Sequence, residues 1–252
     1  AKTLFPYTTL FRSLFFQPQI DARSGELVGA ETLIRWQDPL HGLIPPGRFI
    51  PLAEETGLIQ VIGEWVLAAA CEHLARWERL GLPPLTLAVN LSARQFRQPN
   101  FVEHLIETTS RSGIDPARLE LELTESILLD TNPSTMKTIN EVHAHGVRLS
   151  MDDFGTGYSS LSYLRRLPIQ ELKLDRSFVL DLEQDATNQA LSEAVIRLGE
   201  SLHLTVVAEG VENHGQQRIL KQQRYHVGQG YLFSRPLSAA DLESWLRSVS
   251  ED

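Results

Sequence analysis

The amino-acid sequence predicts an α/β fold, and three observations favour a (β/α)8 barrel over an open sheet. Short apolar runs alternate with amphipathic helical patterns along almost the whole chain, which is typical of βα units around a parallel sheet. About eight such runs fit within the 252 residues, and a (β/α)8 barrel needs about 250. No Gly-x-Gly-x-x-Gly sequence follows the first strand, so a dinucleotide-binding fold is disfavoured.

The start of the chain differs from the alternating units that follow it. Residues 1–13 fit no element that we can define, so we treat them as an unassigned N-terminal segment or linker and expect one domain over residues 14–252. Residues 14–20 and 27–36 are both strand-like, and the polar segment between them contains a glycine, as turns often do. A connection this short allows the two strands to pair as an antiparallel hairpin.

Helix start and stop signals divide the rest of the chain. Pro45-Pro46-Gly47 opens a helical stretch, and Gly57, Gly81, Gly113 and Gly146 each follow a helical pattern, where glycine commonly caps a helix. The expected helices span residues 48–55, 64–80, 100–111, 134–145, 158–166, 186–202, 215–223 and 239–249. The expected strands after the hairpin span residues 85–89, 119–123, 147–151, 169–174, 205–208 and 226–229.

Composition and charge narrow the class of protein. The net charge is −9, with both signs spread along the chain, which argues against a nucleic-acid polymer as the main partner. Cys71 is the only cysteine and lies in an apolar helical stretch, so we expect it in the core of a protein from a reducing compartment. No apolar run reaches the roughly 18 residues of a membrane span and no clear secretory signal is present, so we expect a cytoplasmic protein without direct membrane insertion.

Polar side chains recur at or near the carboxyl ends of the expected strands, the face at which barrel enzymes build their active sites. Five carboxylates there would repel one another without cations, and all-oxygen ligands favour Mg²⁺ or Mn²⁺ over structural zinc. A pair of such ions about 3.5–4 Å apart promotes in-line phosphoryl displacement, so the pattern indicates metal-dependent phosphoester chemistry. The alternative is that some of these acids only cap helices. The polar residues in question are Glu31, Asn90, Glu122, Asp152, Asp153, Lys173, Glu209 and Gln229.

Ordered motifs from about Phe16 to Leu237 resemble those of the EAL domain family, the bacterial cyclic di-GMP phosphodiesterases. They are residues 28–36 (VGAETLIRW), 49–54 (FIPLAE), 89–92 (VNLS), 122–126 (ELTES), 152–160 (DDFGTGYSS), 172–175 (LKLD), 207–212 (VAEGVE) and 228–231 (GQGY). The resemblance implies a modified TIM (β/α)8 barrel with an antiparallel first strand, in agreement with the expected hairpin. It also implies hydrolysis of cyclic di-GMP to linear pGpG by a water that two metal ions activate. Family members are commonly fused to sensor or synthase domains and form homodimers, and we carry both properties over as expectations.

The resemblance further assigns roles to individual residues. The catalytic residues would be Lys173, Glu209 and Glu31, with Lys173 orienting the attacking water or helping to deprotonate it. Two Mg²⁺ or Mn²⁺ ions would be held by Glu31, Asn90, Glu122, Asp152, Asp153 and Glu209, with Asp152 between the two. Substrate would be bound by Gln17, Pro18, Leu33, Arg35, Asp175 and Gln229. The loop that couples metal binding to dimer formation would involve Glu125, Phe154, Gly155, Gly157 and Ser159.

Rival interpretations can be weighed on the same residues. A catalytically inactive cyclic di-GMP receptor is the main alternative, and it is disfavoured because the full ligand set and Lys173 are present. Thr32 replaces the alanine of the family signature, but strand alternation points it away from Glu31, so we expect little effect on metal binding. Residues 153–155 spell the kinase Asp-Phe-Gly motif without the other kinase motifs. His143 and His145 do not share a helix face and are not expected to bind metal.

Overall fold

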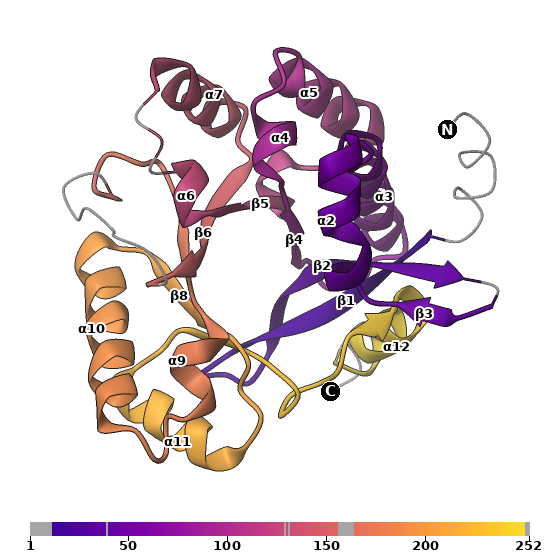
Figure 1. Cartoon of the computed structure of the whole chain (residues 1–252). Helices are drawn as coiled ribbons and strands as arrows, with labels where there is room; N and C mark the ends of the chain where they lie inside the picture. The colour runs from indigo at the N-terminus through magenta and orange to yellow at the C-terminus, as the bar shows by residue number, and fades with distance from the viewer. Residues whose placement is uncertain (1–11, 39, 129, 131, 156–163, 250–252) are drawn as a thin grey trace.

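The computed structural model describes residues 12–38, 40–128, 130, 132–155 and 164–249, and their central feature is a closed barrel of eight strands (Figure 1). Around the barrel the strands follow the order β1, β2, β4, β5, β6, β7, β8, β9, and β9 pairs back with β1. The barrel strands are β1 (Arg12–Asp21), β2 (Leu27–Asp38), β4 (Thr86–Asn90), β5 (Leu119–Thr124), β6 (Arg148–Phe154), β7 (Glu171–Leu174), β8 (Thr205–Ala208) and β9 (Val227–Gln229). The short strands β3 (Gly42–Ile44) and β10 (Leu237–Ser238) extend β2 and β1 beyond the barrel.

Strand β1 runs against both of its barrel neighbours, whereas the other neighbouring barrel strands pair in parallel. The register places Gln17 opposite Glu31 on β2 and Gln19 opposite Gln229 on β9. The prediction of a modified (β/α)8 barrel with an antiparallel first strand is therefore confirmed. The antiparallel direction follows from the chain itself, because only a five-residue turn separates β1 from β2, too little for a parallel crossover.

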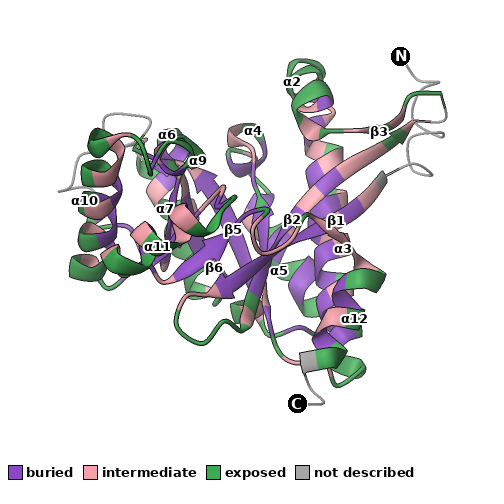
Figure 2. Cartoon of the chain, turned by 90° about the horizontal axis from the view of Figure 1, so that it is seen from below, coloured by how far each residue is buried: buried purple, intermediate pink, exposed green. Residues whose placement is uncertain are grey.

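Helices cover the outside of the barrel, and their apolar faces pack on the strands (Figure 2). Figure 2 shows the strands as the buried centre, while the outward helix faces are exposed. Among the described residues no helix combines the length and the apolar character that crossing a membrane requires. The helices are α2 (Pro46–Thr56), α3 (Ile59–Arg79), α4 (Ala93–Phe96), α5 (Phe101–Ser112), α6 (Glu125–Leu128), α7 (Pro133–Ala144), α9 (Arg176–Leu180), α10 (Ala186–Leu202), α11 (His214–Gln223), α12 (Ala239–Val249) and the 3-10 helix η1 (Pro116–Arg118).

Element boundaries differ from the sequence prediction in a few places. Helix α3 begins at Ile59 rather than residue 64, because Ile59 and Gly63 are already buried on the face that the helix presents to the barrel. Strand β1 begins at Arg12, two residues earlier than expected, and β6 continues to Phe154 through an irregular pairing with β7. The expected helix over residues 158–166 falls mostly outside the described residues. Cys71 is buried as expected.

Candidate active site

The carboxyl ends of the parallel strands converge on one buried ammonium group. Lys173 on β7 is 1% exposed, and its Nζ atom lies 2.6 Å from Glu122 Oε1 and 2.7 Å from Glu209 Oε1. Asp152 Oδ1 lies 3.5 Å from the same atom and Glu31 Oε2 lies 3.8 Å from it. Four of the expected metal ligands and the expected catalytic lysine, each from a different strand or strand end, therefore share one site.

Two carboxamides fix the carboxylate of Glu31. Asn90 Nδ2 on β4 donates to Glu31 Oε1 over 2.6 Å, and Gln229 Nε2 on β9 donates to Glu31 Oε2. Each amide must present its NH₂ group, since an ionised carboxylate can only accept hydrogen bonds. The Oδ1 atom of Asn90 is thereby turned away from Glu31, so it is the atom of this side chain that suits a cation.

The charges at this site are out of balance. Burial raises the pKa of Glu122 well above its ordinary value, and the carboxylates of Glu31 and Asp152 add to that effect, although Lys173 opposes it. Burial would lower the pKa of Lys173, but the surrounding carboxylates outweigh it and hold that pKa well above the ordinary value. The lysine is accordingly a fixed positive charge in this structure, and one ammonium serves several acids.

Glu209 directly follows the last residue of β8, and burial raises the pKa of its carboxyl group to about 7. The pKa of Glu209 is higher in the folded state than its unfolded value near 4.5, so protonation of Glu209 stabilises the folded protein. This stabilisation is fully present below about pH 4.5 and is lost by about pH 7. We expect metal-free protein to lose on the order of 3 kcal/mol of unfolding free energy over that interval relative to a Glu209→Gln variant. Urea unfolding in EDTA at several pH values measures this difference. Parallel pH profiles for the two proteins would contradict the assignment.

Asp152 and Asp153 take different positions at the end of β6. Asp153 has a positive φ of 57°, and its backbone N–H donates to Asp152 Oδ1 over 2.9 Å. This turn places Asp153 at the exposed rim, while the Asp152 carboxylate stays near Lys173. Burial, followed by the charges of Asp152 and Asp175, raises the pKa of Asp153. Asp152 therefore lines the cleft, whereas Asp153 is exposed and is not among the residues that line it.

The segment after β6 is tied to the helix that follows β5. Gly155 N–H donates to Glu125 Oε2 over 3.3 Å, and Phe154 is buried. Gly155 has a φ of 97°, and a Cβ atom there would meet the Phe178 ring at 2.9 Å, so glycine is required twice over. Gly157 and Ser159, which were assigned to the same loop, lie outside the described residues.

The expected substrate-binding residues are only partly brought together. Gln17 lines the cleft, and its Nε2 donates to the Ser234 carbonyl over 2.6 Å. Pro18 is buried, and strand alternation places it on the face opposite to Gln17, away from the cleft. Asp175 accepts the N–H of Ser177 over 3.0 Å and caps α9. This contact engages the Asp175 carboxylate at the start of a helix, and Asp175 is not among the residues that line the cleft.

Leu33 and Arg35 lie further along β2 than Glu31. Both are partly exposed, and neither lines the cleft around Lys173. The Arg35 guanidinium donates to the Ile34 carbonyl over 3.0 Å. Partial burial lowers the pKa of Arg35, and the nearby Tyr231 and Glu31 oppose that change.

Several residues at the cleft were not expected from the sequence. The Arg235 guanidinium lies 4.4 Å from the centre of the Tyr231 ring, and Tyr231 is half-exposed at the rim. Arg176 pairs with Glu212 over 2.7 Å on the other side, and both line the cleft. A half-exposed aromatic ring beside two arginines suits a flat, anionic ligand. Glu212 and Tyr231 end the VAEGVE and GQGY motifs, and Arg176 and Arg235 follow the LKLD and GQGY motifs, which is the signal that could have found them.

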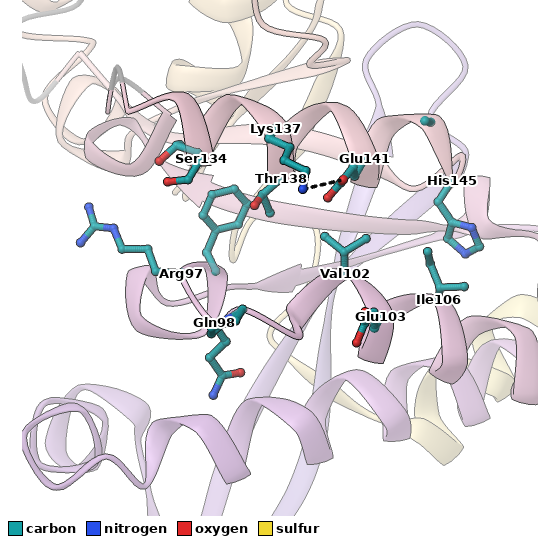
Figure 3. A pocket seen from close by; sticks show the side chains of 14 residues that line it. Arg97, Gln98, Val102, Glu103, Ile106, Ser134, Lys137, Thr138, Glu141 and His145 are labelled. Atoms are coloured by element: carbon teal, nitrogen blue, oxygen red, sulfur yellow. Dashed lines mark ion pairs between the residues drawn. The ribbon is translucent and has the colours of Figure 1, made fainter.

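The cleft at the carboxylates encloses about 220 Å³, whereas a larger cavity, about 820 Å³, lies elsewhere, between the α4–α5 segment and α7 (Figure 3). Its lining mixes both signs of charge, and Lys137 and Glu141 pair across one turn of α7 at 3.6 Å. His145 is engaged with Thr109 over 2.8 Å. The larger cavity brings no set of carboxylates together, so we place the chemistry in the smaller cleft.

The cleft residues fit divalent cations by their chemistry. Neither carboxylate oxygen of buried Glu122 has a well-formed hydrogen bond, although Oε1 lies close to Lys173. The donors are carboxylates and one carboxamide, the oxygen ligands that Mg²⁺ and Mn²⁺ take. Among the residues that the structure describes, no three acidic, histidine or cysteine side chains already stand in metal-binding geometry. The Lys173 ammonium supplies positive charge to these carboxylates, as cations also would.

Comparison with known proteins then settles the family. The model of the EAL domain matches residues 11–236. The chain belongs to the EAL domain family. Among relatives, the bifunctional diguanylate cyclase/cyclic di-GMP phosphodiesterase MucR of Pseudomonas aeruginosa is 44% identical over 229 residues, which is 91% of this chain and 33% of MucR. The chain therefore spans about a third of the length of this curated relative.

Solved structures of EAL domains agree with the fold. The PaMucR phosphodiesterase in complex with c-di-GMP has a TM-score of 0.90 at 44% identity, covering 93% of this chain and 95% of that one. Klebsiella pneumoniae BlrP1 in complex with calcium and cy-diGMP has a TM-score of 0.78 at 30% identity, covering 90% of this chain and 56% of that one. The fold class and the family predicted from the sequence are both confirmed.

Proposed function

We propose that this EAL domain hydrolyses cyclic di-GMP to linear pGpG. The observation that carries the proposal is the cluster of Glu31, Glu122, Asp152 and Glu209 within 4 Å of Lys173 Nζ at the mouth of the barrel. An inactive receptor would need only the pocket, whereas this chain has the complete acid, amide and lysine set. MucR bears a phosphodiesterase name, and the PaMucR and BlrP1 structures contain the cyclic dinucleotide.

We assign the cation ligands to Glu31, Asn90, Glu122 and Asp152 for one ion and to Asp152, Asp153 and Glu209 for a second, with Mg²⁺ or Mn²⁺ as the ions. Divalent cations at such a site lower the pKa of water and neutralise charge that develops on the phosphate. Calcium in the BlrP1 complex supports a divalent cation in this family. The buried Glu122 Oε2 atom, which has no hydrogen-bond partner among the described residues, and the surplus of carboxylates support it in this chain.

The protein's own groups then position the reaction. Lys173, held as a cation by its carboxylate neighbours, orients the attacking water and fixes the acids around it. Glu209 lies 2.7 Å from that ammonium and is placed to receive the proton that the water loses. Water adds to phosphorus as the bond to the 3′ oxygen breaks, which opens the ring and leaves a 5′-phosphate and a 3′-hydroxyl, whose proton balances the one that the water loses. Tyr231 and Arg235 at the rim would contact the nucleoside part.

The assembly of the whole protein is part of the proposal. The relatives are about three times as long as the region they share with this chain, so we propose that the domain works within a larger bacterial signalling protein in the cytoplasm. The hydrogen bond between Gly155 and Glu125 is adjacent in sequence to the loop after Gly155 that we expect to respond to dimer formation. A homodimer of the domain is therefore proposed as its working form.

Turnover of cyclic di-GMP with Mg²⁺ or Mn²⁺, set against an EDTA control, tests the function directly. We expect pGpG, identified by chromatography, to appear only with metal and to fall to background in EDTA. The carboxylates are negatively charged, so without cations they cannot neutralise the charge on the phosphate. Restoring activity with excess Mg²⁺ shows that EDTA acted by removing metal. Retained binding of cyclic di-GMP without turnover would instead support the receptor.

A further inference from the structure

A buried chain of amides leads from strand β1 to the Glu31 carboxylate. Gln19 on β1 lies opposite Gln229 on β9, and its Nε2 donates to Gln229 Oε1 over 3.0 Å. Gln229 Nε2 in turn donates to Glu31 Oε2. Gln19 and Gln229 are 5% and 6% exposed, so water competes little for these hydrogen bonds. Both polar atoms of Gln229 are engaged within the protein.

The direction of this chain is dictated by its last member. Gln229 Nε2 is the atom that donates to Glu31 Oε2, so the amide presents its NH₂ group to the carboxylate. The carbonyl oxygen of Gln229 then faces Gln19, and Gln19 must donate. If the Gln229 amide turned over, two oxygen atoms would face each other in a buried place, and a polar atom would lose its partner.

We propose that Gln19 is a positioning residue, which holds the Gln229 amide in the one orientation that fixes Glu31 for catalysis. With Asn90 on Oε1 and Gln229 on Oε2, the plane of the Glu31 carboxylate is set from both sides. The inference rests on the proposed function, since it concerns the same carboxylate. Outer partners of this kind typically change metal affinity or activity by about 10- to 100-fold when they are replaced.

The space for Gln19 is provided by a glycine on the neighbouring strand. A Cβ atom at Gly29 would lie 2.6 Å from Gln19 Oε1 and 3.1 Å from the Thr86 carbonyl oxygen. Gly29→Ala would therefore push the Gln19 carboxamide out of place without removing any polar group. This gives a perturbation of the chain that is independent of the chemistry of residue 19.

The test varies only the hydrogen-bonding character of residue 19. Gln19→Glu keeps the shape but offers only acceptors, Gln19→Lys offers only donors, and Gln19→Met offers neither. Gln37→Glu, on an exposed position of β2, is the control for added charge. For each protein we would measure kcat and KM for cyclic di-GMP, Mn²⁺ affinity by isothermal titration calorimetry in the absence of nucleotide, and thermal unfolding as the check of folding.

We expect Gln19→Glu to lower kcat at least tenfold with little change in KM, and to weaken Mn²⁺ binding, because the Gln229 oxygen then faces Glu31. Gln19→Lys should recover most of that loss, while Gln19→Met and Gly29→Ala should fall between them. If Gln19 had only a structural role, the losses in kcat and Mn²⁺ affinity would follow the melting temperatures of the variants. They would not depend on whether residue 19 can donate a hydrogen bond. Equal kcat and Mn²⁺ affinity in Gln19→Glu and the wild-type chain would overturn the proposal. Turnover by the wild-type protein tests the proposed function separately. The Mn²⁺ titration tests the positioning of Glu31 without requiring any turnover.

Discussion

Replacing Lys173 by methionine should lower kcat for cyclic di-GMP by about 10²- to 10³-fold, the size of effect seen when one preorganised charge-stabilising group is lost. Methionine fills a similar volume but leaves Glu122 and Glu209 without the ammonium that lies 2.6 Å and 2.7 Å from them. The water and the acids would then lose the group that orients them. Steady-state turnover at saturating Mg²⁺ measures the change, and Lys137→Met, on the exposed face of α7, is the matched control.

The same variant has a second expected effect, on stability. Removing one partner of a buried ion pair costs about 3–5 kcal/mol, because the remaining charge stays buried without compensation. We expect Lys173→Met to lose stability of this order in EDTA and to regain more from added Mg²⁺ than the wild-type protein does, since cations and the lysine compensate the same carboxylates. Unfolding in urea with and without Mg²⁺ measures both. Unchanged turnover, or a loss of stability that Mg²⁺ does not reduce, would contradict the central role of Lys173.

Much of the fold could be predicted from the sequence because most barrel strands carry two separate sequence signals. An apolar run marks the buried strand, and the polar residue that ends it marks the functional rim, as Val89-Asn90 and Ala208-Glu209 do. Parallel strands that close a barrel must bring these ends to one face. Geometry therefore gathers residues that lie far apart in the chain, such as Glu31 and Glu209, without any contact being predicted.

The rest of the site depends on side-chain directions that periodicity does not specify. Gln19 follows Gln17 on the same face of β1 and reads as an ordinary strand residue, yet its partner Gln229 is 210 residues away. The family resemblance assigned both Gln17 and Pro18 to substrate binding, but strand alternation places their side chains on opposite faces of β1. Asp175 follows the strand that bears Lys173, yet its hydrogen bonds to Ser177 show it capping a helix. Only the register between strands distinguishes such cases.

Charge balance at the site also could not be read from the residue types. The sequence shows five acids and one lysine, but not that the lysine is completely buried among them. Burial determines whether these groups repel, share protons or pair, since Coulomb interactions strengthen as water is excluded. The raised pKa values of Glu122 and Glu209 are consequences of depth in the barrel. The sequence suggested a need for cations from the number of acids alone. The structure gives the physical reason, which is that these acids are buried together around a single ammonium group.

Replacing Glu31 by alanine should reduce hydrolysis of cyclic di-GMP to the background of the assay. The Glu31 carboxylate is where three groups of the site meet, because it accepts from Asn90 and Gln229 and lies 3.8 Å from Lys173. Its loss removes an expected cation ligand and frees both amides to turn. Turnover and Mn²⁺ affinity by calorimetry measure these two consequences, and Glu26→Ala, on the exposed turn before β2, is the control.

The fold should survive the change at Glu31, because two effects on stability oppose each other. Two donors lose their acceptor, and the buried Gln229 amide left unsatisfied costs about 1–3 kcal/mol, whereas exposed Asn90 can turn to water. Repulsion among the remaining carboxylates falls at the same time, so we expect the unfolding free energy in EDTA to change by less than about 2 kcal/mol. Glu31→Gln separates shape from charge, since its amide must turn an NH₂ group toward either Asn90 or Gln229. Undiminished turnover in Glu31→Ala would refute the assignment of Glu31 as a cation ligand, and loss of activity through unfolding would appear in the melting curve.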